Sequence, residues 1–147
     1  MIKLNSAYDN DNIFAKILRG ELPNITVLET ANVLAFMDIM PQREGHTLVV
    51  PKCPAVCLLD LPADYFEPLL NATQRVAAAV QKAVNAQGIT IMQLNGSAAG
   101  QTVPHLHFHV IPGSILGLAP HSDESESPKA VNQETLIDVA NRIKMYL

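Results

Sequence analysis

Three short apolar segments in the first third of the chain, joined by short links, restrict its fold more than any other feature. They cover residues 24–29 (NITVLE), 32–38 (NVLAFMD) and 46–51 (HTLVVP), and their β-branched and aromatic residues are typical of strands. Thr30 and Ala31 predict a tight turn between the first two segments, and residues 41–45 form a loop before the third. Links of this length favour antiparallel pairing, because parallel strands need a crossover of about a dozen residues or more.

Helical patterns flank these segments. Residues 11–20 (DNIFAKILRG) predict a short helix that ends at Gly20, and its candidate N-caps are Asp9, Asn10 and Asp11. Residues 64–87 predict the main helix, with Asp64 as its cap, Gly88 at its end and Pro68 near the start of its regular part. Apolar and small residues recur there at spacings of three and four: Phe66, Leu69, Leu70, Thr73, Val76, Ala77, Val80 and Val84.

The second half adds two strands and a closing helix. Residues 89–94 (ITIMQL) and 105–111 (HLHFHVI) predict strands on either side of a glycine-rich loop, and residues 119–130 predict a mobile polar loop. Residues 132–147 predict a helix capped by Asn132, and its apolar face consists of Leu136, Val139, Ile143 and Tyr146. This order of elements predicts one α+β domain, residues 1–147, around an antiparallel sheet.

Charge and composition exclude several classes of protein. Ten basic and 14 acidic residues give a net charge of −4, which argues against a broad nucleic-acid interface. No apolar run approaches the length of a membrane span or a signal-peptide core, so we expect a cytoplasmic protein without a membrane partner. Cys53 and Cys57 are expected to be free thiols, because a disulfide between them would close a loop of almost no length.

Three of the five histidines alternate with apolar residues, at positions 105, 107 and 109. In a strand, His105, His107 and His109 would share one face while Leu106, Phe108 and Val110 point to the core. Imidazole titrates near neutral pH, so a neutral ring can act as a nucleophile while a cationic ring stabilises charge. That combination is what transfer of a phosphoryl or nucleotidyl group requires.

A structural role or a metal-binding role would also place histidines on a strand. The strand could have a polar face that merely contains histidines, although strict alternation beside a glycine-rich loop disfavours this. It could also be a metal site, but alternate strand positions are about 6.6–7 Å apart, so the three rings would not all reach one ion without distortion. His46, His121 and the two cysteines show no ligand spacing that would complete such a site.

The loop before the histidines is a candidate phosphate site. Residues 95–102 (NGSAAGQT), beginning with Asn95, are rich in small residues that let backbone N–H groups approach a phosphate. Thr102 could place a hydroxyl near a leaving group or bond only its own backbone. His46 is either a supporting group or a satisfied core histidine, and Asp38 could either bind ribose hydroxyls or form a turn. His121 is expected to be solvated.

These motifs together resemble the histidine-triad (HIT) family, in particular its bacterial Hint-like branch. The resemblance covers roughly residues 11–112 in consistent order, and residues 113–147 form a variable tail. The matching strings are HLHFHVI at 105–111, IFAKI at 13–17, AFMDI at 35–39, PQ at 41–42, GHTLVVPK at 45–52 and AGQTV at 99–103.

The resemblance implies a fold and an activity. The fold is a five-stranded antiparallel sheet with helices, which two protomers join into a ten-stranded sheet in a homodimer. The activity is cleavage at the α-phosphate of a purine nucleotide, through a nucleotidyl-histidine intermediate and without a cofactor or a required metal. The expected substrates are purine nucleoside phosphoramidates, with dinucleoside polyphosphates as a close variant.

The resemblance also assigns roles to individual residues. His107 would be the nucleophile, its Nδ1–H held by a backbone carbonyl, while His105 and His109 supply charge and protons and His46 supports them. Asp38 would hold the ribose. The base pocket would consist of Ile13, Phe14, Ile17, Phe36 and Ile39. The phosphate and leaving group would lie along Gly100, Gln101, Thr102 and Val103.

Three departures from the family pattern stand out. Leu94 occupies the position where relatives carry Asn or Gln, so a polar contact to substrate is missing. Asn12, Ala15 and Pro54 stand at the Cys and His positions of the zinc site found in many bacterial relatives, so we expect no zinc there. Gly113 replaces an Arg that often follows the triad strand. Because of Leu94, a nucleotide-binding or scaffolding module with weak turnover is the alternative to an enzyme.

Overall fold

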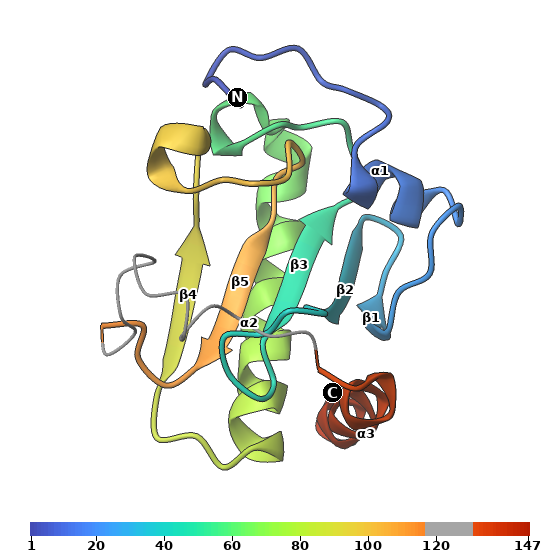
Figure 1. Cartoon of the computed structure of the whole chain (residues 1–147), viewed down its shortest axis with the longest axis vertical. Coiled ribbons are helices and arrows are strands. Elements are labelled where there is room, and N and C mark those ends of the chain that lie inside the picture. The colour runs from blue at the N-terminus through green and yellow to red at the C-terminus, as the bar shows by residue number, and fades with distance from the viewer. Residues whose placement is uncertain (117–130) are drawn as a thin grey trace.

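A single antiparallel sheet of five strands organises the molecule (Figure 1). The computed structural model describes residues 1–116 and 131–147. The strands are β1 (Thr26–Glu29), β2 (Val33–Met37), β3 (Thr47–Pro51), β4 (Ile89–Gln93) and β5 (Phe108–Pro112). Their order across the sheet is β1-β2-β3-β5-β4, and every neighbouring pair is antiparallel. The α+β class and the five-stranded antiparallel sheet expected from the sequence are therefore confirmed.

The described residues form three α-helices beside the sheet. The helices α2 (Phe66–Ala83) and α3 (Gln133–Lys144) pack on one face, and the short helix α1 (Ile13–Leu18) lies near the other face. Short 3-10 turns, which the sequence pattern did not predict, occur at Leu58–Asp60, Ala63–Tyr65 and Ser97–Ala99. Among the described residues, no helix is both long and apolar enough to cross a bilayer.

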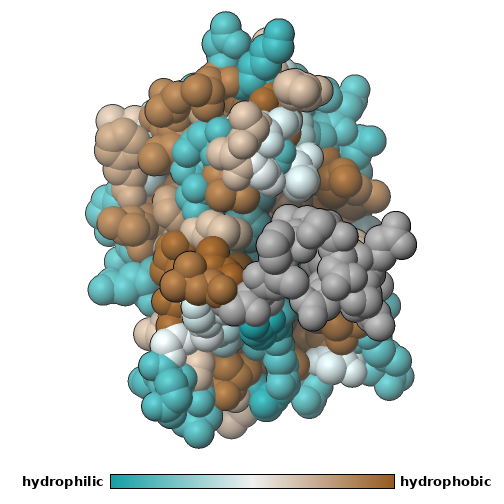
Figure 2. Space-filling view, turned by 60° about the vertical axis from the view of Figure 1, so that its left-hand side comes forward, coloured by the Kyte–Doolittle hydropathy of each residue, from teal (hydrophilic) through white to brown (hydrophobic). Residues whose placement is uncertain are grey.

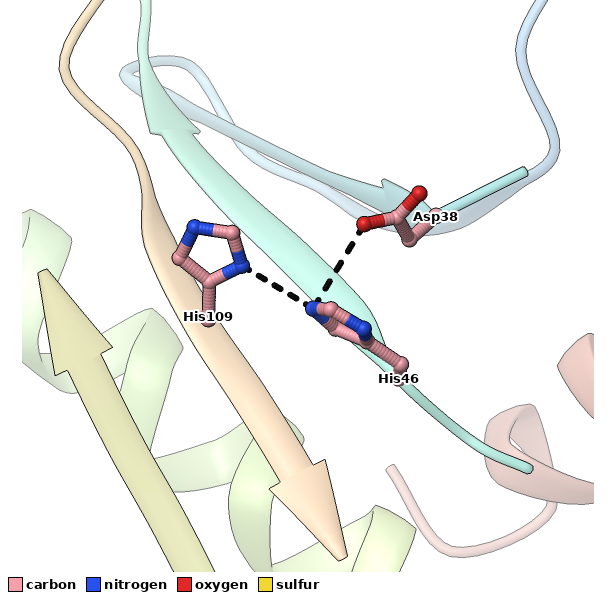
Figure 3. Close-up of side chains that lie close together, drawn as sticks. All are labelled: Asp38, His46 and His109. Carbon is pink, nitrogen blue, oxygen red and sulfur yellow. Dashed lines mark hydrogen bonds and ion pairs between the residues drawn. The ribbon is translucent and has the colours of Figure 1, made fainter. Parts of the chain in front are cut away.

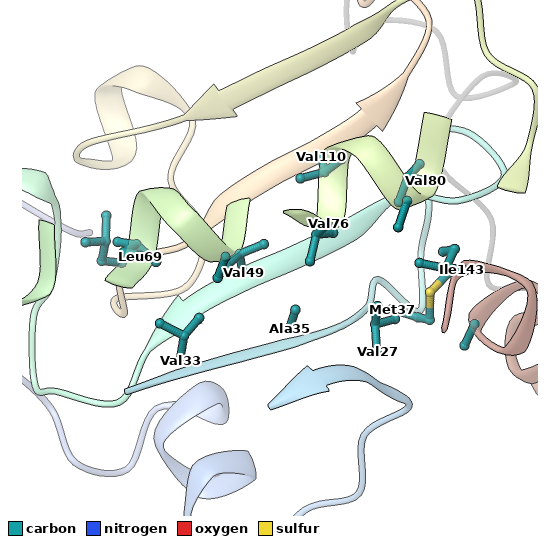
Figure 4. Packing of buried hydrophobic residues seen from close by; sticks show 14 of the residues in the cluster. Val27, Val33, Ala35, Met37, Val49, Leu69, Val76, Val80, Val110 and Ile143 are labelled. Atoms are coloured by element: carbon teal, nitrogen blue, oxygen red, sulfur yellow. The ribbon is translucent and has the colours of Figure 1, made fainter. Parts of the chain in front are cut away.

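Alternating side chains of β2 and β3 divide between two apolar clusters, since successive residues of a strand point to opposite faces. Val33, Ala35 and Met37 pack under α2 and α3, together with the larger cluster shown in Figure 4. Leu34 and Phe36 point to the other face, where Phe14 of α1 joins them. Both faces of these central strands are buried, which explains why their sequences are continuously apolar.

The helix boundaries differ from the predicted ones at their caps. Asn12, not Asp9, Asn10 or Asp11, caps α1, because its Oδ1 accepts a hydrogen bond from Ala15 N at 2.9 Å. Asp64 does not cap α2; it lies in a 3-10 turn, and α2 begins at Phe66 with Pro68 in its first turn. Asn132 caps α3 as predicted, accepting a hydrogen bond from Glu134 N.

Two predicted apolar faces are only partly buried. On α2, Leu69, Thr73, Val76 and Val80 are buried, whereas Phe66 and Leu70 are 55% and 63% exposed. On the C-terminal helix, Leu136, Val139 and Ile143 are buried, but α3 ends at Lys144 and Tyr146 is half exposed beyond it. Phe66 and Leu70 therefore lie on a face of α2 that the rest of the described structure does not fully cover.

The predicted strand 105–111 is too long at its N-terminal end. Pairing with β3 and with β4 begins at Phe108, so His105 and His107 precede the strand instead of standing on its face. The backbone bonds elsewhere in this stretch, because Leu106 N donates to Ala55 O at 2.9 Å. Leu106 and Val110 are buried and Phe108 packs against them from a partly buried position, as alternation predicted.

The remaining sequence expectations concern the cysteines and the polar loop. Cys53 and Cys57 are buried free thiols, as expected. The polar loop 119–130, with His121, lies outside the described residues.

Candidate active site

His107 lies at the end of the segment that leads into β5 and is buried, with 6% of the residue exposed. Its Nδ1 is 2.7 Å from the carbonyl oxygen of His105. Because a carbonyl can only accept, Nδ1 carries the proton and Nε2 retains its lone pair. The ring of Phe14 packs edge-on against His107, with centroids 5.0 Å apart. The geometry thus presents a neutral imidazole with a free nucleophilic nitrogen.

His105 is completely buried and supports this arrangement from behind. Its Nε2 donates to the carbonyl oxygen of Pro51 at 2.9 Å, so its Nδ1 is an acceptor. The hydroxyl of Tyr8 lies 2.5 Å from that Nδ1. Tyr8 was not among the residues selected from the sequence.

His46, His109 and Asp38 form a second group beside His107 (Figure 3). The backbone N–H of Gln42 donates to Nδ1 of His46 at 3.0 Å, which leaves the proton of His46 on Nε2. That Nε2 lies 2.9 Å from Nδ1 of His109 and 3.5 Å from a carboxylate oxygen of Asp38. Since Nδ1 of His109 accepts, the neutral ring of His109 carries its proton on Nε2.

Burial controls the charge of all four rings. Desolvation lowers the pKa of His105, His107 and His109 to about 4, and it also lowers the pKa of His46. All four are therefore neutral in the free protein near pH 7. The division into one neutral ring and one cationic ring, expected for the reaction, therefore stays a prediction for the substrate-bound state.

Asp38 opposes this effect at His109. Its negative charge acts to raise the pKa of His109, although desolvation is the larger cause. One of its oxygens also accepts a hydrogen bond from Met40 N at 2.9 Å, which fixes the carboxylate at the end of β2. An additional anion beside His109 would raise the pKa of this ring further.

A pocket of about 660 Å³ opens onto His107 and His109. Most of the residues assigned to nucleotide binding line it: Ile13, Phe14, Ile17, Phe36, Asp38, Ile39, Thr102 and Val103. Phe14 and Phe36 form a buried floor, whereas Ile13 and Ile39 are 54% and 66% exposed. Apolar side chains that line a pocket and remain open to solvent indicate a binding surface for a flat apolar ligand, because core residues would be buried.

Part of the lining was not recognised from the sequence. Leu22, Pro23, Asn24, Met37, Met40 and Leu48 also contribute. Leu22, Pro23 and Asn24 belong to the link after α1, whose composition resembles any loop. Only the fold brings this link against the end of β2.

Three of the predicted loop residues do not line the pocket. The Gln101 side chain is buried and braces the loop: its amide donates to Val56 O at 2.7 Å and accepts from Gly96 N at 2.7 Å. The Asn95 side chain accepts from Leu58 N at 2.8 Å. Gly100 adopts a φ of +101°, which L-residues rarely adopt. Asn95 and Gln101 therefore shape the loop with their side chains.

Leu94 packs within this loop. It is half-buried and does not line the pocket, and its Cδ1 lies 3.2 Å from the point that a Cβ on Gly100 would occupy. Its side chain therefore supports the turn at Gly100.

One group of side chains in the described residues has the composition of a metal site. The ligand atoms of Asp38, His46 and His109 all lie within 4.8 Å of one another. A cation there would have to displace the proton that His46 shares with His109. Asn12, which stands at one of the positions where the family resemblance implies a zinc ligand, uses its side chain as the α1 cap.

Comparison with known proteins agrees with this geometry. A family model described as the HIT domain matches residues 19–115. Adenosine 5'-monophosphoramidase of Candida albicans is 36% identical over 104 residues, covering 68% of each chain. The protein of that name from Schizosaccharomyces pombe is 34% identical over 138 residues, covering 90% of this chain and 98% of its own.

Solved structures give the same answer. A Hit-like protein from Bartonella henselae superimposes with a TM-score of 0.86 at 46% identity, covering 97% of this chain and 100% of its own. A zinc-bound histidine triad family protein from Mycobacterium smegmatis superimposes with a TM-score of 0.75 at 30% identity, covering 92% of both chains. The chain therefore belongs to the HIT family.

Proposed function

We propose that this protein hydrolyses purine nucleoside phosphoramidates at the α-phosphate through a nucleotidyl intermediate on His107. The observation that carries the proposal is the orientation of the His107 ring: Nδ1–H is held by His105 O at 2.7 Å while the ring lines the pocket. Relatives named adenosine 5'-monophosphoramidase support the substrate class. An activated nucleophile that is oriented by a second group is the usual requirement for covalent catalysis.

Each part of the nucleotide would contact a different part of the pocket. The purine base would lie between the apolar side chains of Ile13, Phe36 and Ile39, and the ribose would lie near Asp38. The α-phosphate would then meet His107 and His109, beside the backbone of the loop that contains Gly100. The anionic phosphate raises the pKa of His109 in the same sense as Asp38, so one proton enters the site with the substrate.

The first chemical step forms one bond and breaks another. Nε2 of His107 attacks phosphorus, and the bond from phosphorus to the leaving nitrogen breaks. The protonated His109 donates the proton of its Nε2 to that nitrogen, so the product leaves as a neutral amine. The His105 carbonyl stabilises the positive charge that develops on the His107 ring.

The second step returns the protein to its starting state. A water molecule attacks phosphorus, and neutral His109 takes one of its protons. The bond to His107 Nε2 breaks, and the nucleoside monophosphate leaves together with the proton that His109 took from water, so all four rings are neutral again. In the resting state His46 holds the proton of neutral His109 on Nε2, because its own Nδ1 is occupied by Gln42 N–H. While Nδ1 of His109 carries a proton during the reaction, Nε2–H of His46 would turn to the carboxylate of Asp38, 3.5 Å away.

The test is a turnover assay with adenosine and guanosine phosphoramidates, next to a diadenosine polyphosphate. Hydrolysis of the phosphoramidates with a higher kcat/KM than the polyphosphate supports the proposal. Tight nucleotide binding without turnover on any of the three would instead favour the scaffolding alternative, for which Leu94 is the motivating residue.

We also infer that two copies pair along β4. This strand forms one edge of the sheet, and sheet edges are normally covered or paired. Ile91 of β4 and Leu70 of α2 are 44% and 63% exposed and line a shallow hollow together. On the side of the molecule that Figure 2 shows, apolar patches lie between polar ones.

A further inference from the structure

The N-terminal segment, residues 1–12, contacts both the loop and the histidines of the proposed reaction centre. Ile2 N donates to the Ser97 hydroxyl at 2.7 Å, and Ser97 N donates to Ile2 O at 2.9 Å. Further along, Tyr8 reaches His105, and Asn12 caps the helix that carries Phe14. A stretch without regular secondary structure thus ties the loop and the histidines to the base pocket.

The contact of Tyr8 with His105 is specific in direction. Nε2 of His105 donates to Pro51 O, so Nδ1 can only accept, and the Tyr8 hydroxyl at 2.5 Å is the donor. The two rings also meet edge-on, with centroids 5.6 Å apart. His105 is 0% exposed, so loss of the hydroxyl would leave a buried acceptor without its partner.

These ring bonds replace strand bonds that His105 lacks. Strand β5 begins only at Phe108, and Leu106 N bonds to Ala55 O. The position of His105 therefore depends on its two ring contacts, one to the end of β3 and one to the N-terminal segment. The carbonyl of this same residue accepts from Nδ1 of His107 at 2.7 Å.

We propose that Tyr8 is a positioning residue for the reaction proposed above. Its hydroxyl holds the His105 ring in one orientation, and through that residue it holds the carbonyl that orients the nucleophilic ring of His107. Neither Tyr8 nor His105 lines the pocket, so this role requires no contact with the nucleotide. The expected effect on kcat rests on the proposed function, whereas the hydrogen bond between Tyr8 and His105 is independent of it.

The variant Tyr8→Phe removes only the hydroxyl and keeps the edge-on ring contact. We expect kcat for adenosine phosphoramidate to fall about tenfold, because one buried hydrogen bond that orients the nucleophile is lost. KM and the Kd of AMP should stay within about twofold. Tyr146→Phe is the matched control, since Tyr146 is half exposed and lies outside the site. Unchanged kcat, or a change confined to KM, would overturn the proposal.

Nitrogen-15 NMR of the histidine rings supplies a readout that needs no turnover. In Tyr8→Phe, the Nδ1 resonance of His105 should move toward that of an unbonded imidazole nitrogen, while Nε2 stays protonated. The resonances of His107 should move as well, since its ring would lose its fixed orientation. If the wild-type protein hydrolyses no phosphoramidate, the proposed function fails, and the His107 resonances still decide the role of Tyr8. Unchanged His107 resonances would contradict it.

Discussion

Nε2 of His46 lies 2.9 Å from Nδ1 of His109, and this contact places the proton of the neutral His109 ring on the nitrogen opposite His46. A backbone N–H, that of Gln42, sets the direction of the whole chain of hydrogen bonds. His46 is almost completely buried, so it acts on the reaction through its neighbours His109 and Asp38.

Replacing His46 should therefore affect poor leaving groups most. His46→Leu keeps an apolar side chain of similar size but removes the donor to His109. We expect kcat to fall about tenfold to a hundredfold for an alkylamine phosphoramidate, because that leaving group depends on protonation. An arylamine of low basicity should lose much less. His46→Gln, which retains an amide donor, serves as the control. Equal losses on both leaving groups would argue against a role of His46 in directing the proton of His109.

The buried rings make folding stability depend on pH. Each ring with a pKa of about 4 in the folded state has a pKa of about 6.5 when unfolded, so the unfolded chain binds more protons between these values. The free energy of unfolding should therefore fall as the pH drops from about 6.5 to 4, by up to roughly 1.4 kcal/mol per pH unit for each ring. Denaturant titrations at several pH values measure this slope.

A variant isolates the histidine contribution from that of the carboxylates. His109→Asn removes one of the three rings and should reduce the slope between about pH 6 and 4.5, where most carboxylates are still ionised. The same slope in both proteins would show that His109 is not held neutral by burial.

Pairing along β4 predicts a homodimer. Light scattering at micromolar concentration should give close to twice the 16.0 kDa mass of one chain. Ile91→Lys should shift the protein toward the monomer, because it adds charge to the proposed interface. Ile137→Lys on α3 is the matched control, since Ile137 is 42% exposed against 44% for Ile91. A wild-type monomer at that concentration, or an equal effect of both changes, would refute this interface.

Leu94 is expected to reduce the rate on simple substrates. An amide at this position would add a hydrogen bond to a charged oxygen or orient the loop, and such a bond is worth roughly 1.5–3 kcal/mol. Leu94→Asn should then raise kcat/KM for a simple nucleoside phosphoramidate by about an order of magnitude. If Leu94 instead contacts an apolar leaving group, the change would impair only a bulky apolar phosphoramidate. Unchanged values on all substrates would show that Leu94 only supports the turn at Gly100.

Much of the fold could be predicted from the sequence because it depends on local patterns. The runs that became β2 and β3, and the spacing on α2, are signals within a few neighbouring residues. The predicted start of β5 was wrong, because a strand begins where its backbone finds pairing partners. The alternation of histidine and apolar residues from His105 to His109 does not determine that point.

The candidate site, like the fold, could be predicted from the sequence only in part. The histidines and the apolar pocket residues were recognisable by residue type. Tyr8 was not, since its partner His105 lies 97 positions away in the sequence. The contribution of Gln42 was equally hidden, because a backbone N–H leaves no mark in the sequence. Gln101 looked like a substrate contact, but its amide is engaged by the loop and by Val56.

Trapping the covalent intermediate tests the proposed mechanism at its first chemical step. Wild-type protein is quenched within the first turnover of adenosine phosphoramidate, and mass spectrometry with peptide mapping locates the adduct. Covalent catalysis by His107 predicts one nucleotidyl group on His107, none in His107→Ala, and a kcat for that variant lower by several orders of magnitude. An adduct on another residue, or a His107→Ala variant that keeps more than about a tenth of the wild-type kcat, would contradict it.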